Sequence, residues 1–336
     1  MRKAFWTACF IVLISSAAAA QEHTIIVMSH ADHTVYELEP VSGKILNKFV
    51  TKDQPHEGAV SPDGKTIYAA VPNGPHVVVV DATTFKEKVT IESEFFRSSS
   101  RSGSSSPHGS ALTTDGSKLY VGLENADIPG IVVIDTKTNR IIKKIDILLR
   151  GGHFLAIQPG TDKLYYPMRE DNRVVVIDTK TDKILKIIPV EGGPVGVGFA
   201  PNQEVWIHND RDGAVHVIDG KTDQVVKTLH YVGFGAGRMA VSRDGKWAAS
   251  THSRTQDVTI INAVTKEVAG RVDVGGGPGF ALFSPDSTKL YVMVSSTDEV
   301  CVVDLNTMKL AARHKVGDGP FGGDIRYLRG RPTSSN

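Results

Sequence analysis

Residues 153–194 read HFLAIQPGTDKLYYPMREDNRVVVIDTKTDKILKIIPVEGGP. Four short apolar runs follow one another in this stretch, FLAI, LYYPM, VVVID and ILKIIPV, and polar turns rich in Gly, Pro, Asp and Thr separate them. Runs of this length and composition, bounded by turn residues, indicate β-strands. The same layout recurs along the chain, and a period of about 20–50 residues is the signature of a repeat architecture.

The residue that ends the third run measures the period. It is acidic, or Asn, in every copy: Glu39, Asp81, Asp135, Asp178, Asp219, Asn262 and Asp304. Successive copies lie 41 to 43 residues apart, except for one interval of 54 that contains a serine-rich insert, 97–106. Seven copies of four strands predict an all-β fold, a seven-bladed β-propeller with four antiparallel strands per blade, because radial repetition leaves only short, protected edges. A linear solenoid would need polar caps at both ends, and the sequence shows none.

The two ends of the chain predict how the ring closes. The first copy begins at TIIVM (24–28), which matches the second strand of a blade, and FGGDIRYL (321–328) supplies the missing innermost strand. The C-terminal strand therefore completes the first blade. We expect one propeller domain over residues 21–330, followed by a flexible tail, 331–336.

The amino end has the pattern of a signal peptide over residues 1–20. Arg2 and Lys3 precede an apolar run, 4–14, and small residues end at Ala20. The run is too short to span a bilayer, which argues against a membrane span. We expect cleavage before Gln21 and a periplasmic or secreted protein, in preference to a buried N-terminal helix.

The net charge and the cysteine content argue against several classes of protein. The formal net charge of +1 becomes −1 when the leader is removed, so the protein has no basic footprint for nucleic acid. Only Cys301 then remains, which rules out an intramolecular disulfide, and no C-x-x-C-H sequence is present for a covalent c-type haem. Cys301 lies in the apolar run EVCVVD and is expected to be a buried small hydrophobe.

Several segments resemble the YVTN-type propeller repeat: 59–71 (AVSPDGKTIYAAV), 113–123 (TTDGSKLYVGL), 283–294 (FSPDSTKLYVMV), 131–140 (IVVIDTKTNR) and 174–183 (VVVIDTKTDK). The resemblance covers residues 24–328 and implies the propeller fold. Proteins with such repeats include surface-layer proteins, lactonase-like enzymes, heavy subunits of quinone-cofactor amine dehydrogenases and the haem d1 domain of nitrite reductases. The Tyr-Val-Thr-Asn tetrad itself is replaced by Tyr-Val-Gly (120–122) and Tyr-Val-Met (291–293), which leaves the subfamily open.

Antiparallel strands place the turns alternately at the two ends of the ring. Turns such as SPDGK and DTKTDK recur at one end, the lower face, where Asp, Thr and Gly favour tight turns. At the other end, the upper face, the copies differ. The residues that open the innermost strands, beside the central channel, are His56, His108, His153, Val195, Arg238, Gly279 and Phe321.

The histidines of the upper face form a candidate metal site. Three of them open consecutive blades, and two more follow second strands, giving the set His56, His108, His153, His208 and His252. Neutral imidazole is a common ligand for zinc, copper and iron, and three such ligands leave a position open for water or substrate. The alternative is that each histidine lines the channel as a hydrogen-bonding residue, and both interpretations stay open.

Arg238 occupies the same repeat position on the far side of the ring. Its guanidinium could bind the carboxylate or phosphate of a small anionic ligand, and Glu57 and Glu170 are candidate general bases. Pairing of Arg238 with Glu170 or Asp210 is the alternative. The segment ESEFFRSSSRSGSSSP (92–107), which contains the serine-rich insert, could form a lid whose Phe95 and Phe96 cover the site, or a surface loop.

Two functions follow from these patterns. The first is an exported enzyme or cofactor-bearing protein, with hydrolysis or elimination at a lactone or similar carbonyl, or redox chemistry if the metal is copper or iron. The second is a non-catalytic periplasmic binding protein or scaffold for a protein partner. Fold alone does not separate them.

Overall fold

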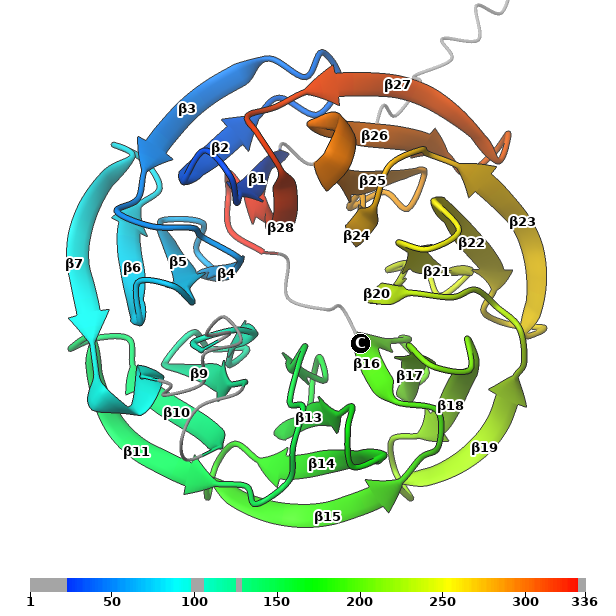
Figure 1. Ribbon diagram of the computed structural model, residues 1–336, viewed down its shortest axis with the longest axis horizontal. Helices are drawn as coiled ribbons and strands as arrows, with labels where there is room; N and C mark the ends of the chain where they lie inside the picture. The colour runs from blue at the N-terminus through cyan, green and yellow to red at the C-terminus, as the bar shows by residue number, and fades with distance from the viewer. Residues whose placement is uncertain (1–22, 98–105, 125–128, 332–336) are drawn as a thin grey trace, which may run out of the picture.

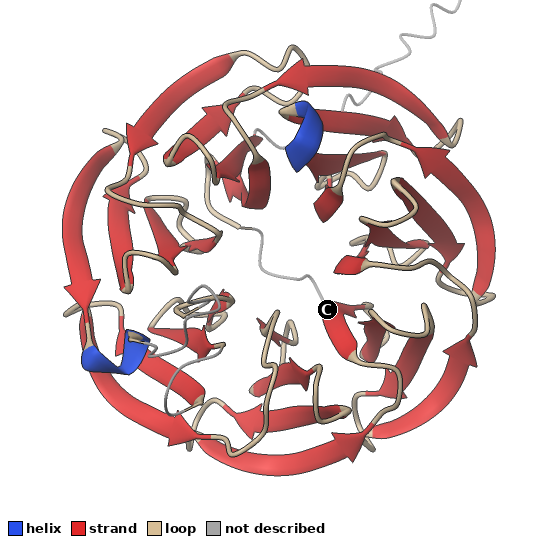
Figure 2. Ribbon diagram, in the orientation of Figure 1, coloured by secondary structure: helices blue, strands red, loops and turns tan. Residues whose placement is uncertain are grey.

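The computed structural model describes residues 23–97, 106–124 and 129–331, which form seven four-stranded antiparallel sheets arranged as a ring around a central axis (Figure 1). The predicted seven-bladed propeller is confirmed. The expected signal peptide, most of the serine-rich insert and all but the first residue of the expected tail lie outside the described residues. Two short 3-10 helices, η1 (Glu94–Phe96) and η2 (Ser295–Thr297), are the helical elements of Figure 2. Within the described ranges, no helix has the length and apolar character needed to cross a membrane.

The blades follow one another in chain order. In blades 2 to 7 the chain runs from the innermost strand to the outermost, whereas the innermost strand of blade 1 comes from the C-terminal end. Blade 1 consists of β28 (Pro320–Tyr327), β1 (His23–Ser29), β2 (Thr34–Leu38) and β3 (Ile45–Val50). Blade 2 consists of β4 (Glu57–Val60), β5 (Thr66–Val71), β6 (His76–Asp81) and β7 (Lys86–Glu92). Blade 3 consists of β8 (Ser110–Leu112), β9 (Lys118–Leu123), β10 (Gly130–Asp135) and β11 (Arg140–Asp146). Blade 4 consists of β12 (Ala156–Ile157), β13 (Lys163–Met168), β14 (Arg173–Asp178) and β15 (Lys183–Pro189).

The remaining three blades have the same order. Blade 5 consists of β16 (Pro194–Phe199), β17 (Glu204–Asn209), β18 (Val215–Asp219) and β19 (Gln224–Leu229). Blade 6 consists of β20 (Ala236–Val241), β21 (Trp247–His252), β22 (Asp257–Asn262) and β23 (Glu267–Asp273). Blade 7 consists of β24 (Pro278–Phe283), β25 (Lys289–Val294), β26 (Glu299–Asp304) and β27 (Lys309–Lys315).

Strand β28 closes the ring as the sequence predicts. It pairs antiparallel with β1, with Ile325 opposite Ile25, so that the first blade is built from both ends of the chain. Because the last strand is the innermost strand of the first blade, opening the ring requires the loss of this pairing.

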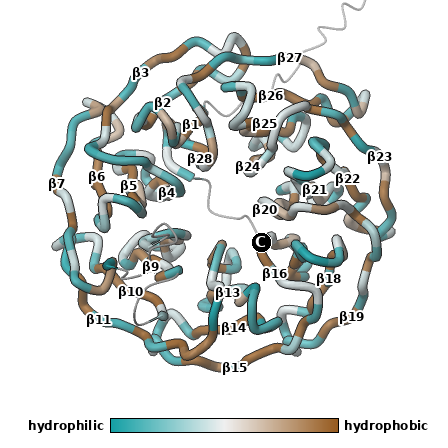
Figure 3. The backbone as a smooth tube through the Cα atoms, in the orientation of Figure 1, coloured by the Kyte–Doolittle hydropathy of each residue, from teal (hydrophilic) through white to brown (hydrophobic). Residues whose placement is uncertain are grey.

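The burial pattern explains why second and third strands read as continuous apolar runs. Each blade packs between two neighbours, so both faces of strands such as β6 (HVVVVD) are buried. The outermost strands, such as β7 (KEKVTIE), are largely exposed and carry lysines, which protect an unpaired edge. Figure 3 shows hydrophilic and hydrophobic residues mixed along these outer strands. Cys301 is buried in β26, as predicted.

In every blade, the pairing of the third strand with the fourth strand has a register shift at the equivalent position. In blade 2 the shift lies between Val79 and Val80. Such bulges increase the local twist of a sheet. The repeat therefore encodes the curvature of the blades as well as their strands.

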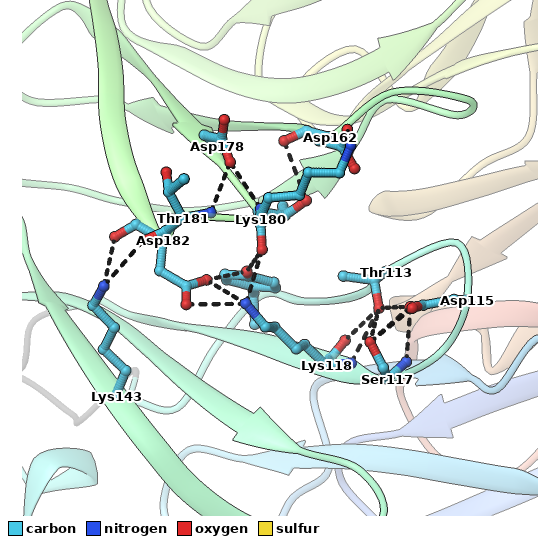
Figure 4. A network of polar contacts seen from close by, with 12 residues as sticks. Thr113, Asp115, Ser117, Lys118, Lys143, Asp162, Asp178, Lys180, Thr181 and Asp182 are labelled. Carbon is cyan, nitrogen blue, oxygen red and sulfur yellow. Dashed lines mark hydrogen bonds and ion pairs between the residues drawn. The ribbon is translucent and has the colours of Figure 1, made fainter.

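The acidic residue that ends the third strand caps the turn that follows. Asp178 Oδ1 accepts the N–H groups of Lys180 and Thr181, both at 2.8 Å, and Asp182 closes the turn in the left-handed conformation with a φ of 54° (Figure 4). Equivalent bonds form at Asp81, Asp219, Asn262 and Asp304. The Asp and Thr residues of the lower face thus have the structural role that the sequence predicts.

The same turns connect neighbouring blades through ion pairs. Lys118, the first residue of β9, lies 3.0 Å from the carboxylate of Asp182 in blade 4 (Figure 4), and Lys163 lies 2.8 Å from Asp223 in blade 5. Between blades 5 and 6 the charges are exchanged, with Glu204 in the first position and Lys266 in the second, 2.8 Å apart.

This exchange predicts a compensating pair of substitutions. Glu204→Lys places two cations together and is expected to lower the free energy of unfolding by about 1 kcal/mol. Adding Lys266→Asp recreates the arrangement of the other two interfaces and should restore most of the loss. Urea denaturation of the three proteins measures this, and a double variant no more stable than Glu204→Lys would contradict it.

Candidate metal centre and channel

A histidine lies one to three residues ahead of the innermost strand in blades 2, 3 and 4. The main-chain N–H of His56, His108 and His153 bonds in each case to a carbonyl of the second strand of the same blade, at 2.9–3.3 Å. The shared pairing gives the three side chains a common direction. Their ring centres are 4.2 Å apart for His56 and His108, and 4.4 Å apart for His108 and His153. The three imidazoles therefore lie side by side, as their repeat position predicts.

Two buried glutamates lie on either side of the central histidine. His108 Nδ1 is 3.2 Å from Glu57 Oε1, and His108 Nε2 is 3.3 Å from Glu124 Oε2. Glu57 also lies 3.9 Å from His56 Nδ1, and Arg169 lies 3.8 Å from the other oxygen of Glu124. Glu57, His108 and Glu124 are only 3–4 % exposed, so these charges interact with little screening by water.

Burial and neighbouring charge give the three imidazoles different proton affinities. Burial lowers the pKa of His56 and His153 well below the usual value, and the charge of His108 adds to this. Burial also acts to lower the pKa of His108, but the carboxylates of Glu124 and Glu57 outweigh it and raise the pKa. Burial raises the pKa of Glu124. The two outer imidazoles are therefore neutral at pH 7, the form that binds metals.

Several polar atoms of this cluster have no hydrogen-bond partner. Among the described residues, His56 Nδ1, Glu57 Oε1, His108 Nδ1 and His153 Nδ1 are buried and make no hydrogen bond, and the ion-pair contacts of the first three are with one another. They belong to two groups whose ligand atoms all lie within 4.8 Å of one another, namely His56, Glu57 and His108, and His108, Glu124 and His153. Buried polar groups are almost always paired, so this concentration of unbonded atoms fits a bound cation. Imidazole nitrogen and carboxylate oxygen are ligands for zinc, iron and copper.

Tyr166 adds a phenol to the cluster. Its hydroxyl is buried without a hydrogen bond, and burial together with the nearby Glu124 and Glu57 raises its pKa well above the usual value. A Cβ atom at Gly152 would lie 2.2 Å from this hydroxyl, so glycine is needed there. The sequence did not single out Tyr166, because it lies in the apolar run LYYPM and looks like a core residue. Glu124 could have been predicted as a site residue, because it directly follows the second strand of the blade that carries His108.

The other two predicted ligands, His208 and His252, form a separate pair between blades 5 and 6. Their ring centres are 5.0 Å apart, and both side chains are fully buried. His208 Nε2 bonds to the Gly233 carbonyl (3.1 Å) and its Nδ1 lies 2.6 Å from Ser250 Oγ, while His252 Nδ1 bonds to Asp257 (2.8 Å). Neither histidine belongs to the two groups of candidate ligands found among the described residues.

Arg238 lies across the channel from the histidines and contacts aromatic rings. Its guanidinium carbon is 5.0 Å from the centre of the Phe280 ring and 5.6 Å from that of Phe154. Within the part of the chain that the structure describes, no carboxylate lies within ion-pair distance of it. The alternative pairing of Arg238 with Glu170 or Asp210 is wrong, because Glu170 is exposed and Asp210 lies 3.8 Å from Arg254 instead.

A cavity of about 180 Å³ occupies the channel beside Arg238. Glu57 also lines it, so the cavity and the histidine cluster share one carboxylate. Phe154 connects the two regions as well, because its ring centre is 4.5 Å from that of His153. The two candidate sites are thus adjacent.

The predicted lid is corrected in part. Phe96 is fully buried in the core between blades 2 and 3, with Phe95 packed against the same cluster, so these rings fill an interface and do not cover the histidines. Residues 98–105 of the insert lie outside the described residues.

The fold and the site define a seven-bladed β-propeller with a cluster of buried histidine and glutamate side chains at one end of its channel. No family model matches the sequence, so the similarity to YVTN-type repeats stays a resemblance. A search of curated proteins finds no match either.

Solved structures share the fold. Hydrazine synthase from Kuenenia stuttgartiensis has a TM-score of 0.70 and 24% identity, covering 80% of this chain and 88% of that one. A functionally unknown protein from Desulfotomaculum acetoxidans has a TM-score of 0.77 and 15% identity, with coverage of 91% and 99%. Dihydro-heme d1 dehydrogenase NirN in complex with DHE has a TM-score of 0.64 and 17% identity, with coverage of 92% and 75%. At these identities the similarity supports the propeller fold alone.

Proposed function

We propose that the protein is an exported metalloprotein that holds a divalent transition metal ion at the histidine cluster and acts as a hydrolase or lyase on a small anionic substrate. The observation that carries the proposal is the convergence of buried nitrogen and oxygen atoms from His56, Glu57 and His108, which lie within 4.8 Å of one another and face each other across contacts of 3.2 and 3.9 Å. Structural histidines normally have hydrogen-bond partners, as His208 does.

The residues of the cluster have two proposed roles: some hold the metal, and others transfer protons. His56, Glu57 and His108 would hold the metal, and His153 with Glu124 provides further donors on the other side of His108. A bound divalent ion would supply Lewis-acid chemistry toward a carbonyl group or water. When His56, Glu57 and His108 hold the metal, Glu124 is the buried carboxylate left without a ligand role, so we assign the general-base role to Glu124, whose pKa is raised by burial.

Arg238 is placed to bind the anionic group of the substrate. It faces the channel with no competing carboxylate among the described residues, and the cavity beside it includes Glu57. Glu170, the second base suggested by the sequence, is exposed and takes no part in the proposed reaction.

Elemental analysis of protein purified without an affinity tag tests the proposal. We expect at least about one metal ion per chain. A triple variant in which His56, His108 and His153 are all alanine should lose this metal. Metal-free protein whose behaviour is unchanged by the triple substitution would support the non-catalytic binding protein instead.

Export is tested by mass spectrometry of the protein recovered from the periplasm. Its sequence is expected to begin at Gln21.

An oxidoreductase is the second candidate, and the donor set favours it in one respect. Two histidines and one carboxylate with open positions are the ligand set of non-haem iron oxygenases. The names of two proteins with this fold, a hydrazine synthase and a dihydro-heme d1 dehydrogenase, also indicate redox enzymes. Iron or copper in the elemental analysis would favour this candidate, and zinc would favour the hydrolase or lyase.

A further inference from the structure

We propose that the channel cavity binds a monocarboxylate with a compact apolar body, about the size of one six-membered ring, and that Arg238 binds its carboxylate. This deepens the proposed function by naming the class of ligand. The site consists of Arg238 and the apolar wall beside it, so it can be tested apart from the metal.

The first argument is the unpaired guanidinium. Arg238 stacks near Phe280 and Phe154, and the two carboxylates that share its cavity have partners of their own. Glu57 lies against His108, while Asp324 Oδ2 accepts the Val60 N–H at 2.8 Å and lies 3.7 Å from Arg331. Arg238 is partly buried, and a carboxylate supplied by a ligand would add an ion pair that the fold leaves unmade. The planar guanidinium matches a carboxylate with two parallel hydrogen bonds.

The second argument is that the backbone holds Arg238 in place. Its N–H bonds to Thr251 Oγ1 at 3.0 Å, at a register shift in the pairing of β20 with β21. A Cβ atom at Gly237 would lie 2.4 Å from the carbonyl oxygen of Gly279, so the innermost strands of blades 6 and 7 are in close contact. The backbone of Arg238 is therefore fixed, and the contacts of the guanidinium with the Phe280 and Phe154 rings restrain it before any ligand binds, which reduces the cost of binding.

The third argument is the size and lining of the cavity. Its volume is about 180 Å³, and its apolar wall includes Leu112, Leu155, Ile157, Phe199, Phe280 and Leu282. An apolar cavity of about 150 Å³ is large enough to bind benzene. The same lining also includes the polar side chains of Ser110, Thr113 and Asp324, so the cavity offers polar as well as apolar contacts to a ligand.

The fourth argument distinguishes a carboxylate from a phosphate. Arginine binds both, and the charged residues that line the cavity are Arg238, Arg331, Glu57 and Asp324. Asp324 lies near Arg331 and Glu57 lies against His108, so one cation, Arg238, is left without a carboxylate partner. A monoanion balances this charge, whereas a dianion would leave a negative charge in excess. A single carboxylate therefore fits the site better than a phosphate.

Benzoate is the probe for the experiment, and binding is measured by isothermal titration calorimetry on the metal-loaded protein. Benzyl alcohol lacks the charge, acetate lacks the ring, and inorganic phosphate has the wrong charge and shape. We expect benzoate to bind at least about tenfold more tightly than each of these, as one charge-assisted hydrogen bond is worth about 1.5–3 kcal/mol. Phosphate binding as tightly as benzoate, or no benzoate binding at millimolar concentration, would overturn the inference.

Two substitutions and one control locate the site. Arg238→Gln should weaken benzoate binding by about 10- to 100-fold. Arg238→Lys, which keeps the charge but loses the planar fork, should fall between Arg238→Gln and the wild type. Arg243→Gln is the matched control, because Arg243 also stacks on an aromatic ring, 5.7 Å from the centre of Tyr327, but does not line the cavity. Equal benzoate affinity in Arg238→Gln and wild type would refute the assignment.

Measuring the metal content of the same proteins distinguishes failure of the carboxylate site from failure of the metal centre. Arg238→Gln should keep the metal of the wild type, since Arg238 belongs to neither ligand group. Full metal content without benzoate binding in the wild type would refute this inference alone. Benzoate binding by a protein that holds no metal would refute the proposed metal centre alone.

Discussion

The His108→Ala variant is expected to lose nearly all of its bound metal, because His108 belongs to both groups of candidate ligands. Even changes beside metal ligands typically weaken metal affinity 10- to 100-fold, so removal of a shared ligand should weaken it by more than about 100-fold. The measurement is metal content per chain after dialysis against a weak chelator. Retention of the wild-type metal content by His108→Ala would exclude both groups as the metal site.

Two further variants identify which group holds the metal. His56→Ala removes a ligand of the first group only, and Glu124→Gln removes one of the second group only. Loss of metal in one of them and not in the other assigns the site, whereas loss in both indicates that all the ligands are shared. His230→Ala is the control, because His230 is an exposed histidine of blade 5 outside the cluster.

The second large effect concerns acid stability and His208. Burial, together with the neighbouring His252, lowers the pKa of His208 from 6.5 to about 3 in the folded protein. The unfolded chain therefore takes up a proton at a higher pH than the folded one does. The resulting loss of stability is absent above about pH 6.5 and grows as the pH falls toward 3.

The size of the His208 effect follows from linkage. Each pKa unit corresponds to about 1.4 kcal/mol, so lowering the pH from 7.5 to 4.5 should cost about 2–3 kcal/mol through His208 alone. His56 and His153 act in the same direction, which makes the comparison with a variant necessary. Urea denaturation at both pH values should show a smaller loss for His208→Gln than for the wild type. An equal loss in the two proteins would show that His208 does not titrate on unfolding, and His230→Gln should behave like the wild type.

The fold was accessible from the sequence because a repeat places equivalent residues at equivalent positions. The regular spacing from Asp135 to Asp304 predicted the blades, and the incomplete first copy predicted that β28 would pair with β1. The row of His56, His108 and His153 followed for the same reason, since each residue opens the innermost strand of consecutive blades.

The residues that make up the site were harder to predict from the sequence. His208 is the next-to-last residue of β17 and His252 is the last residue of β21. Second strands are packed between blades on both faces, so a side chain there can point into an interface and not into the channel. Repeat position brings both Glu124 and Glu170 to the upper face, yet Glu124 is buried beside His108 and Glu170 is exposed. Repeat position gives the end of the ring at which a residue lies, but not the side chain that it meets in the next blade.

The sequence by itself determined the number of blades, their strand order and the closure of the ring, because these depend on periodic patterns of apolar and turn residues. Only the tertiary structure decided that His108 lies between Glu57 and Glu124, and that Arg238 faces a cavity with aromatic rings and no carboxylate partner among the described residues. The physical reason is that most of these contacts join different blades: Glu57 and His108 belong to blades 2 and 3, and Arg238 and Phe280 to blades 6 and 7, whereas Glu124 follows the second strand of the same blade as His108. Distances between blades depend on how neighbouring sheets twist and pack, which no single repeat encodes.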